Sequence, residues 1–477
     1  MPPAARFPWT AAHFVGVGGI SMSGLACALA GLGVPCSGSD VVASARTQRA
    51  AAAGVGVCIG HDRRHVAALP AGAVVVHNTD VPAANPELQE ARARGLAVEH
   101  RSAVLAWFLR AAGPRAAAVT GTHGKSTTSS LLALAARAGG LDPTVFVGAD
   151  VPGLEGGNYR LGTGPVIAEA DESDGSFLRY RPDVTVITAL EPEHLEHYGG
   201  DFAAVVAAFR RYLGQLPPGA VAVLNADDGR LAGLRDVVPA RAVWYGLGPD
   251  AELTAADLRL DPERTRFTAV LRGEVLCAAA LRLPGRHNVS NALGALGAAL
   301  ALGVDPAPAA AAFAEFEGPV RRFQVLTTAG GITVVDDYAH NPAKVSAALA
   351  GARQRARGRV LAVFQPHRYN RTVQLWDVFG PAFRGCDAVW ITDVYAPAGE
   401  ERVSGVSGRA FADLVRSRSA VPVRFSPNGG AVVDECLGEA RPGDLVIVMG
   451  AGDITLVAHA LAARVEERAR GAAAGPS

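Results

Sequence analysis

Lysine is almost absent from this sequence. Lys125 and Lys344 are the two lysines among 45 basic residues, so arginine supplies nearly all of the positive charge. A lysine inside a motif therefore indicates a specific role and not general surface charge. The 45 basic residues are balanced by 45 acidic residues, and this balance favours neither a nucleic-acid-binding surface nor a polyanionic partner.

Closely spaced cysteines and a membrane span are also missing. No two cysteines have C-x-x-C spacing, which argues against a zinc ribbon or a disulfide framework and is typical of a reducing cytoplasm. Residues 14–39 carry no charge, but seven glycines interrupt them, so we expect a strand, a turn and a helix there. The first ten residues show no signal-peptide pattern, and we expect a cytoplasmic protein.

Apolar runs alternate with Ala/Leu-rich helical stretches along the chain. This alternation predicts βαβ units and mostly parallel sheets. Gly-Pro pairs at 113–114 and 318–319 each separate a helical pattern from a new element. At ~100–200 residues per domain, the chain should form about three domains. We therefore expect an α/β fold with domains at 1–112, 113–317 and 318–477, and strands at 13–17, 73–77, 116–120, 165–170, 184–190, 220–225, 332–337, 360–364, 388–392 and 445–450.

The stretch "VTGTHGKSTT" (119–128) lies between a predicted strand and a predicted helix. It lacks the first glycine of the P-loop pattern, since Val119 stands there. Backbone N–H groups at such a turn converge on one point and bind phosphate. We expect Lys125 to meet the β- and γ-phosphates of a nucleotide and the Ser126 hydroxyl to meet Mg²⁺.

A second glycine cluster, "GVGGISMSG" (16–24), follows the first predicted strand, and Ser39 and Asp40 end the next one. The pattern is similar to the dinucleotide fingerprint, although Ser21 replaces its third glycine. It is consistent with a pyrophosphate at a helix N-terminus and a ribose or base near Asp40. Tight packing in a βα turn is the alternative.

Two acidic segments follow neighbouring strands, "EADESDGSF" (169–177) and "EPEHLEHYGGDF" (191–202). Because ligands bind at the carboxyl ends of parallel strands, both segments should reach the nucleotide loop. Glu172 and His194 are candidate ligands of a second Mg²⁺, and a solvated acidic loop is the alternative for 169–177. His194 and His197 lack the cysteines or H-E-x-x-H pattern of a zinc site.

As a set, the motifs resemble the Mur ligases of peptidoglycan synthesis, in their alanine-adding branch. The resemblance runs from Phe14 to about Leu456, and its phosphate loop, G-T-x-G-K-[ST], needs no glycine at 119. The motifs that carry it are "GTHGKSTT", "EADESD", "EPEHLEHY", "NADD", "GRHNVSNALGA", "RRF", "DDYAHNP", "FQPHRYNRT" and "GAGDI".

The resemblance implies an ATP-dependent ligase with three α/β domains. The first is Rossmann-like and binds a UDP-sugar, the central one is P-loop ATPase-like, and the third is Rossmann-like and binds the amino acid. The expected substrates are UDP-N-acetylmuramate and L-alanine, joined through an acyl phosphate. ATP and two Mg²⁺ ions are implied, with no nucleic-acid or membrane partner and a monomer or homodimer.

Site residues follow from the same resemblance. Lys125, Glu172, His194 and Arg322 are the implied catalytic residues, and Ser126, Glu172 and His194 the implied metal ligands. ATP is expected at Gly121, Thr122, His123, Gly124, Lys125, Ser126, Thr127, His287, Asn288, Asn291, Arg322 and Asp337. The UDP-sugar is expected at Gly18, Gly19, Ile20, Ser21, Met22, Ser39, Asp40, Asn78 and Thr79, and the amino acid at Tyr338, His340, His367, Arg368 and Arg371.

The chain departs from the family pattern at Ala189, Glu193, Glu196 and Asn341. The family usually has Asn, Asp, Asp and His at these positions. Three alternatives stay open: a ligase that recycles a ready-made tripeptide onto the same UDP-sugar, an NAD-dependent oxidoreductase built on residues 16–24, and a UDP-sugar-binding protein without turnover.

Overall fold

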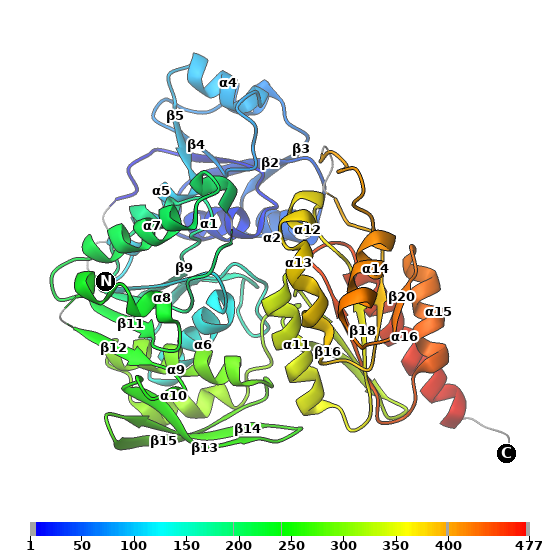
Figure 1. Cartoon of the computed structure of the whole chain (residues 1–477). Coiled ribbons are helices and arrows are strands. Elements are labelled where there is room, and N and C mark those ends of the chain that lie inside the picture. Colours follow the sequence, from blue (N-terminus) through cyan, green and yellow to red (C-terminus); the bar gives the residue numbers. More distant parts are fainter. Residues whose placement is uncertain (1–5, 194, 240, 397–399, 474–477) are drawn as a thin grey trace. The chain divides into compact units, whose positions relative to one another are not determined.

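The computed structural model describes residues 6–193, 195–239, 241–396 and 400–473. Three sheets alternate with helices along the chain, so the predicted α/β class is confirmed (Figure 1). By packing, residues 1–257, 267–279 and 290–315 form one compact unit, and residues 258–266, 280–289 and 316–477 form another. The domain boundaries at 112 and 317 stay predictions.

The first sheet has five parallel strands in the order β3-β2-β1-β4-β5. This is the order of the first five strands of a Rossmann fold, as predicted. All four residues of β1 are buried, and three of them are apolar, with His13 as the polar exception. The strands are β1 (Ala12–Val15), β2 (Cys36–Asp40), β3 (Gly56–Ile59), β4 (Val74–His77) and β5 (Ala97–His100), and the helices are α1 (Ile20–Gly31), α2 (Ala45–Ala52), α3 (Arg63–Ala67), α4 (Pro86–Ala93) and α5 (Arg101–Ala111).

The second sheet has ten strands in the order β15-β14-β13-β12-β11-β10-β6-β9-β7-β8. Pairing is parallel from β13 to β7 and antiparallel between β7 and β8. The sequence analysis did not predict β13 to β15. Polar and part-exposed residues interrupt β13 and β14, whereas β15 does contain an apolar run, at 275–281, that was missed. The strands are β6 (Ala116–Thr120), β7 (Thr144–Phe146), β8 (Tyr159–Arg160), β9 (Val166–Glu169), β10 (Val184–Ile187), β11 (Val221–Asn225), β12 (Ala242–Tyr245), β13 (Leu253–Leu260), β14 (Thr265–Leu271) and β15 (Glu274–Leu281). The helices are α6 (Lys125–Ala138), α7 (Phe202–Gly214), α8 (Gly229–Ala232), α9 (Arg286–Ala301) and α10 (Pro306–Phe313).

The third sheet has the order β16-β17-β21-β18-β19-β20, and only the β16 pair is antiparallel. Successive side chains alternate between two cores, since Phe364 packs with α11 and α14 whereas Leu361 packs with α15 and α16. Helices thus cover both faces. The strands are β16 (Gln324–Ala329), β17 (Ile332–Asp337), β18 (Val360–Phe364), β19 (Ala388–Ile391), β20 (Val423–Phe425) and β21 (Leu445–Met449), and the helices are α11 (Pro342–Arg355), α12 (Tyr369–Gln374), α13 (Trp376–Phe379), α14 (Gly408–Arg418), α15 (Gly429–Glu439) and α16 (Thr455–Ala473).

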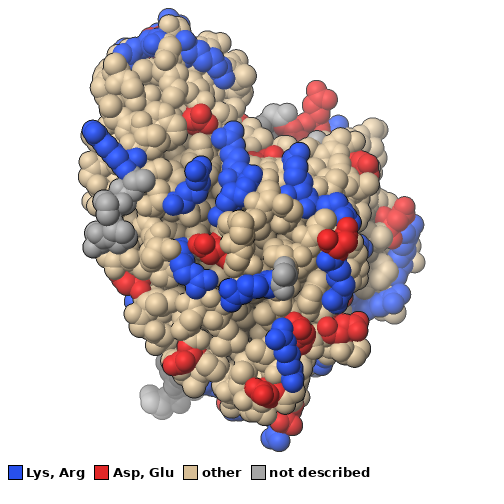
Figure 2. Space-filling view, turned by 90° about the vertical axis from the view of Figure 1, so that its left-hand side faces the viewer, with Lys and Arg blue, Asp and Glu red and all other residues tan. Residues whose placement is uncertain are grey.

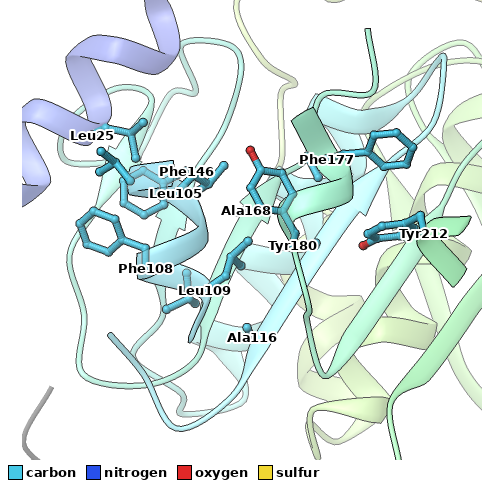
Figure 3. Packing of buried hydrophobic residues seen from close by; sticks show 14 of the residues in the cluster. Leu25, Leu105, Phe108, Leu109, Ala116, Phe146, Ala168, Phe177, Tyr180 and Tyr212 are labelled. Atoms are coloured by element: carbon cyan, nitrogen blue, oxygen red, sulfur yellow. The ribbon is translucent and has the colours of Figure 1, made fainter. Parts of the chain in front are cut away.

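One apolar core connects the first two sheets within the first unit (Figure 3). In it the ring of Phe108 on α5 lies 4.7 Å from that of Phe146, and the ring of Phe177 lies 5.0 Å from that of Tyr212. Aromatic pairs at these distances add stabilisation beyond the area that they bury. The first sheet is therefore held against the second by packing, and not only by the chain between them.

The surface carries charge of both signs. On the face in Figure 2, basic and acidic side chains both occur, and some of them lie next to one another. Within the part of the chain that the structure describes, no helix combines the length and apolarity that a transmembrane span requires.

Candidate active site

Loop 121–124 joins β6 to α6 as the sequence predicts. Gly121 (φ +121°) and Gly124 (φ +77°) have the left-handed backbone that favours glycine. A Cβ at Gly121 would lie 2.8 Å from the backbone nitrogen of Ala189, and one at Gly124 would collide with a side chain of α9. Val119 is buried inside β6, before the turn begins, so the loop closes without a glycine there.

Lys125 forms a buried ion pair at the start of α6. Its Nζ donates to the carbonyl oxygen of Gly121 at 2.8 Å and to Oε1 of Glu172 at 3.0 Å. Burial disfavours the ammonium, but Glu172, Asp171 and Glu169 outweigh it and raise the pKa of Lys125. Burial raises the pKa of Glu172 to about 7, although Lys125 opposes that shift. The pair ties the loop to the first acidic segment.

Some of the side chains at the Lys125–Glu172 pair are of the kind that bind Mg²⁺. Both carboxylate oxygens of Glu172 lie close to Nζ of Lys125, at 3.0 Å for Oε1 and 2.8 Å for Oε2, and carboxylate oxygens are preferred Mg²⁺ ligands. Ser126 and Thr127 are also buried, in the first turn of α6. His194 lies outside the described residues. Among the residues that are described, no group of three or more His, Cys, Asp or Glu side chains could hold a metal, so the Mg²⁺ sites stay predictions.

The first acidic segment contacts the first sheet directly. Thr79 donates to Oδ2 of Asp174 at 2.8 Å, Nε2 of His100 lies 3.4 Å from the same oxygen, and Arg101 donates to Asp171 at 3.2 Å. Burial lowers the pKa of His100 to about 4, so this ring is neutral at pH 7. The segment is therefore part of an ordered polar contact. The predicted contact of Thr79 with the UDP-sugar stays a prediction. His100, at the end of β5, and Arg101, at the start of α5, were not among the predicted site residues, although their position after a strand was an available signal.

The second acidic segment supports the phosphate loop from the other side. Nε2 of His123 lies 2.8 Å from Oε2 of Glu191, and its Nδ1 lies 3.7 Å from Oε2 of Glu193. The hydrogen bond with His123 lowers the pKa of Glu191. The N–H of Thr122 donates to the carbonyl oxygen of Ala189 at 3.0 Å. Glu191 was not among the predicted site residues.

Asp40 holds the glycine loop of the first sheet in place. Its Oδ2 accepts from the N–H of Gly18 at 2.8 Å, and a Cβ at Gly18 would lie 2.8 Å from that same oxygen. Gly19 is the N-cap of α1, whose first turn contains Ile20, Ser21 and Met22. After β4, Oδ1 of Asn78 is buried and has no hydrogen-bond partner among the described residues, which suits a residue that meets a ligand. The predicted UDP-sugar contacts of these residues stay predictions.

Beneath this loop, Glu87 is a fully buried carboxylate with four polar neighbours. Ser39 donates to its Oε2 at 2.6 Å, Nδ1 of His61 lies 3.0 Å from Oε2, Nδ1 of His65 lies 2.6 Å from Oε1, and Nε2 of His13 lies 3.6 Å from Oε1. Burial disfavours the carboxylate, but these neighbours outweigh it and lower the pKa of Glu87 to about 2. Ser39 is itself fully buried and bonded to Glu87.

In the second unit the structure brings the predicted amino-acid-binding residues together. The rings of Tyr338 and His340 lie 5.3 Å apart, and those of His340 and His367 lie 6.0 Å apart. Arg371 donates to Nδ1 of His367 at 2.9 Å. Burial, with the positive charges of Arg371 and Arg368, lowers the pKa of His367 to about 4, so its ring is neutral. Two guanidiniums beside neutral imidazoles form a site suited to a carboxylate.

Arg322 and Asp337 lie in the same unit. The guanidinium of Arg322 lies 5.0 Å from the centroid of the Tyr338 ring, which places it next to the amino-acid-binding residues. Asp337 accepts from the N–H groups of Phe323 at 2.7 Å and Ala339 at 2.8 Å, and burial raises its pKa. Contacts of Arg322 and Asp337 with ATP stay predictions.

The adenine-side residues belong to α9. Burial lowers the pKa of His287 to about 4, and Asn288 donates to the carbonyl oxygen of Pro284 at 2.7 Å. Oδ1 of Asn291 accepts from Thr128 of α6 at 3.3 Å, and this contact links α9 to the helix that begins at the phosphate loop. Binding of adenine by these residues stays a prediction.

The arrangement of a phosphate loop, an acidic edge and a separate carboxylate-binding cluster is typical of an ATP-dependent ligase, and the chain belongs to the Mur ligase family. Residues 11–112 match the Mur ligase family catalytic domain, residues 119–299 the Mur ligase middle domain, and residues 321–452 the Mur ligase glutamate ligase domain.

Relatives and solved structures agree with this placement. UDP-N-acetylmuramate--L-alanine ligase of Symbiobacterium thermophilum is 46% identical, over 96% of this chain and 95% of the relative. The protein of the same name from Pelotomaculum thermopropionicum is 40% identical, over 95% and 97%. The structure of UDP-N-acetylmuramate-alanine ligase from Thermotoga maritima covers 96% of this chain and 99% of its own, with a TM-score of 0.80 and 28% identity. A murein peptide ligase from Psychrobacter arcticus shares the fold, with a TM-score of 0.68 and 22% identity over the same shares.

The Glu87 cluster generates a prediction about acid stability. A folded pKa of about 2 against an ordinary 4.5 stabilises the fold above pH 4.5, and this contribution is lost as the pH falls towards 2. We expect Glu87→Gln to be less stable than the parent at pH 7, by about 3 kcal/mol at most, with a gap that narrows below pH 4.5. The measurement is urea unfolding at pH 7 and pH 3. Glu90→Gln on the same helix is the control, and a gap independent of pH would contradict the assignment.

Proposed function

We propose that this chain joins L-alanine to the lactyl carboxylate of UDP-N-acetylmuramate, with ATP as co-substrate, in the synthesis of peptidoglycan precursors. Relatives of that name match nearly its whole length. The structural observation that carries the proposal is the buried pair of Lys125 and Glu172 at a glycine loop of nucleotide-binding geometry.

The chemistry explains why ATP is needed. A carboxylate is a poor electrophile because resonance stabilises it and its leaving group would be oxide. Transfer of the γ-phosphoryl group to the lactyl carboxylate gives an acyl phosphate, which the amine of L-alanine attacks, and inorganic phosphate leaves. Lys125 offsets negative charge on the phosphoryl group that is transferred, and the N–H groups of the loop hold the neighbouring phosphates.

The metal and the amino acid have separate places in this proposal. Ser126, Glu172 and His194 would hold Mg²⁺, which supplies positive charge to the phosphates when bound. Arg368 and Arg371 bind the α-carboxylate of alanine, and Tyr338 limits the size of its side chain. Arg322 and Asp337 are proposed as ATP-binding residues. We place the enzyme in the cytoplasm, where ATP and the UDP-sugar are available.

The reaction is tested by measuring phosphate release from ATP and Mg²⁺ in the presence of UDP-N-acetylmuramate. L-Alanine is compared with the tripeptide L-Ala-γ-D-Glu-meso-diaminopimelate as the acceptor, and the amide product is identified by mass. Release that depends on alanine supports the proposal. Release with the tripeptide alone would instead identify a recycling ligase, and release with neither acceptor would contradict both.

Lys125→Ala should reduce turnover at least a thousandfold, about the loss seen when one stabilising charge is removed from a transferring phosphoryl group. Binding of UDP-N-acetylmuramate, measured by calorimetry, should change less than about threefold because the lysine acts on ATP. Arg137→Ala, at the other end of the same helix, is the matched control. Near-normal turnover in the Lys125 variant would refute the role assigned to the loop.

Arg371→Ala should raise the KM for alanine at least tenfold and leave the KM for ATP within about twofold, because it removes one guanidinium from the carboxylate-binding pair. Steady-state kinetics with each substrate varied in turn measures the split. Arg384→Ala, an exposed arginine of the same unit, serves as control. If the KM for ATP rises more than that for alanine, the amino-acid site lies elsewhere.

A further inference from the structure

Tyr395 lies in the segment that follows β19 and was not among the predicted site residues. It forms a parallel bridge with His367, outside the regular strands. Its N–H donates to the carbonyl oxygen of Pro366 at 2.9 Å, and its carbonyl oxygen accepts from the N–H of Arg368 at 2.7 Å. The two hydrogen bonds of Tyr395 therefore lie on either side of His367.

The bridge holds a strained backbone in place. Arg368 has φ +62° and ψ 134°, which is a rare conformation for a residue with a side chain. Such conformations are unfavourable and persist where surrounding contacts hold them. Here the hydrogen bond to Tyr395 fixes the peptide N–H of Arg368, immediately before α12 begins. The strain falls on one of the two arginines expected to hold the alanine carboxylate.

The ring of Tyr395 makes a second contact. It stacks on the imidazole of His367, with centroids 5.4 Å apart and planes inclined by only 7°. On another side it packs against Gly452, where an added Cβ would run into the tyrosine ring. The ring thus sets the plane of the His367 imidazole.

The orientation of His367 matters because of its hydrogen bond. An arginine can only donate, so Nδ1 of His367 accepts from Arg371, and a neutral ring then carries its proton on Nε2. The plane set by Tyr395 therefore decides both where Arg371 is held and where an Nε2–H donor points.

We propose that Tyr395 is a positioning residue of the amino-acid site, which holds His367, Arg368 and Arg371 in the arrangement that binds the α-carboxylate of the incoming amino acid. The assignment rests on the proposed function, since it takes that amino acid to be L-alanine. Tyr395 acts through its neighbours, and no contact of its own with the substrate is required.

The test compares Tyr395→Leu with Tyr395→Phe. Leucine removes the stacked ring, and we expect the KM for alanine to rise about tenfold or more while the KM values for ATP and UDP-N-acetylmuramate stay within about twofold. Phenylalanine keeps the ring and should restore most of the affinity for alanine. An equal rise in all three KM values, or no change in any, would overturn the proposal.

Gly452→Ala provides a second test, because its methyl group would meet both the Tyr395 ring and Oε1 of Gln365, so that the ring has to shift without being removed. Gly452→Ala should also raise the KM for alanine more than the KM values for the other two substrates. If the melting temperature of Tyr395→Leu shows that this variant does not fold, the Gly452→Ala variant tests the proposal in its place. An unchanged KM for alanine in a folded Gly452→Ala protein would count against the proposal. If the unsubstituted enzyme shows no turnover with alanine, the proposed function fails independently of Tyr395.

Discussion

The arrangement of the first unit depends on the buried ion pair of Lys125 and Glu172. Each partner would be costly to bury alone, and together they connect the start of α6 with the acidic segment after β9. That segment in turn contacts the first sheet through Thr79 and Arg101. The loop, the acidic segment and the first sheet are thus linked by ion pairs and hydrogen bonds. A substitution of Lys125 or Glu172 would therefore affect the positions of all three.

The chain stabilises its two buried glutamates in different ways. Glu172 has a charged neighbour, Lys125, whose Nζ lies 3.0 Å from Oε1 and 2.8 Å from Oε2, and burial raises the pKa of Glu172 to about 7. Glu87 has both of its oxygens occupied by Ser39, His61 and His65, and its pKa is lowered to about 2. The first carboxylate can interact with a ligand, whereas the second stabilises the structure around it.

Features formed by residues that are close together along the chain could be predicted from the sequence. The loop at 121–124 was predicted, and so were ten strands, β1, β4, β6, β9, β10, β11, β17, β18, β19 and β21, because a continuous buried run and a glycine turn can be recognised in the sequence. The Glu87 cluster and Tyr395 were missed, since their partners lie 22 to 74 residues away or form an isolated bridge. Such contacts depend on the fold, and the spacing of residues in the sequence does not indicate them. The short buried strand β7 and the apolar strand β15 were also missed, whereas β13 and β14 have no continuous apolar run.

Contacts with the backbone explain two departures from the family pattern, at Ala189 and Asn341. Ala189 acts through its peptide group, whose carbonyl oxygen accepts from Thr122, so this support of the loop needs no side chain there. Asn341 is the N-cap of α11, and its Oδ1 accepts from the N–H of Lys344 at 2.8 Å. Asparagine is among the best N-cap residues, whereas histidine is not a preferred one. The substitution therefore favours helix capping at a position next to His340. His340 and His367 still supply two imidazoles to the proposed amino-acid site without a second histidine in this motif.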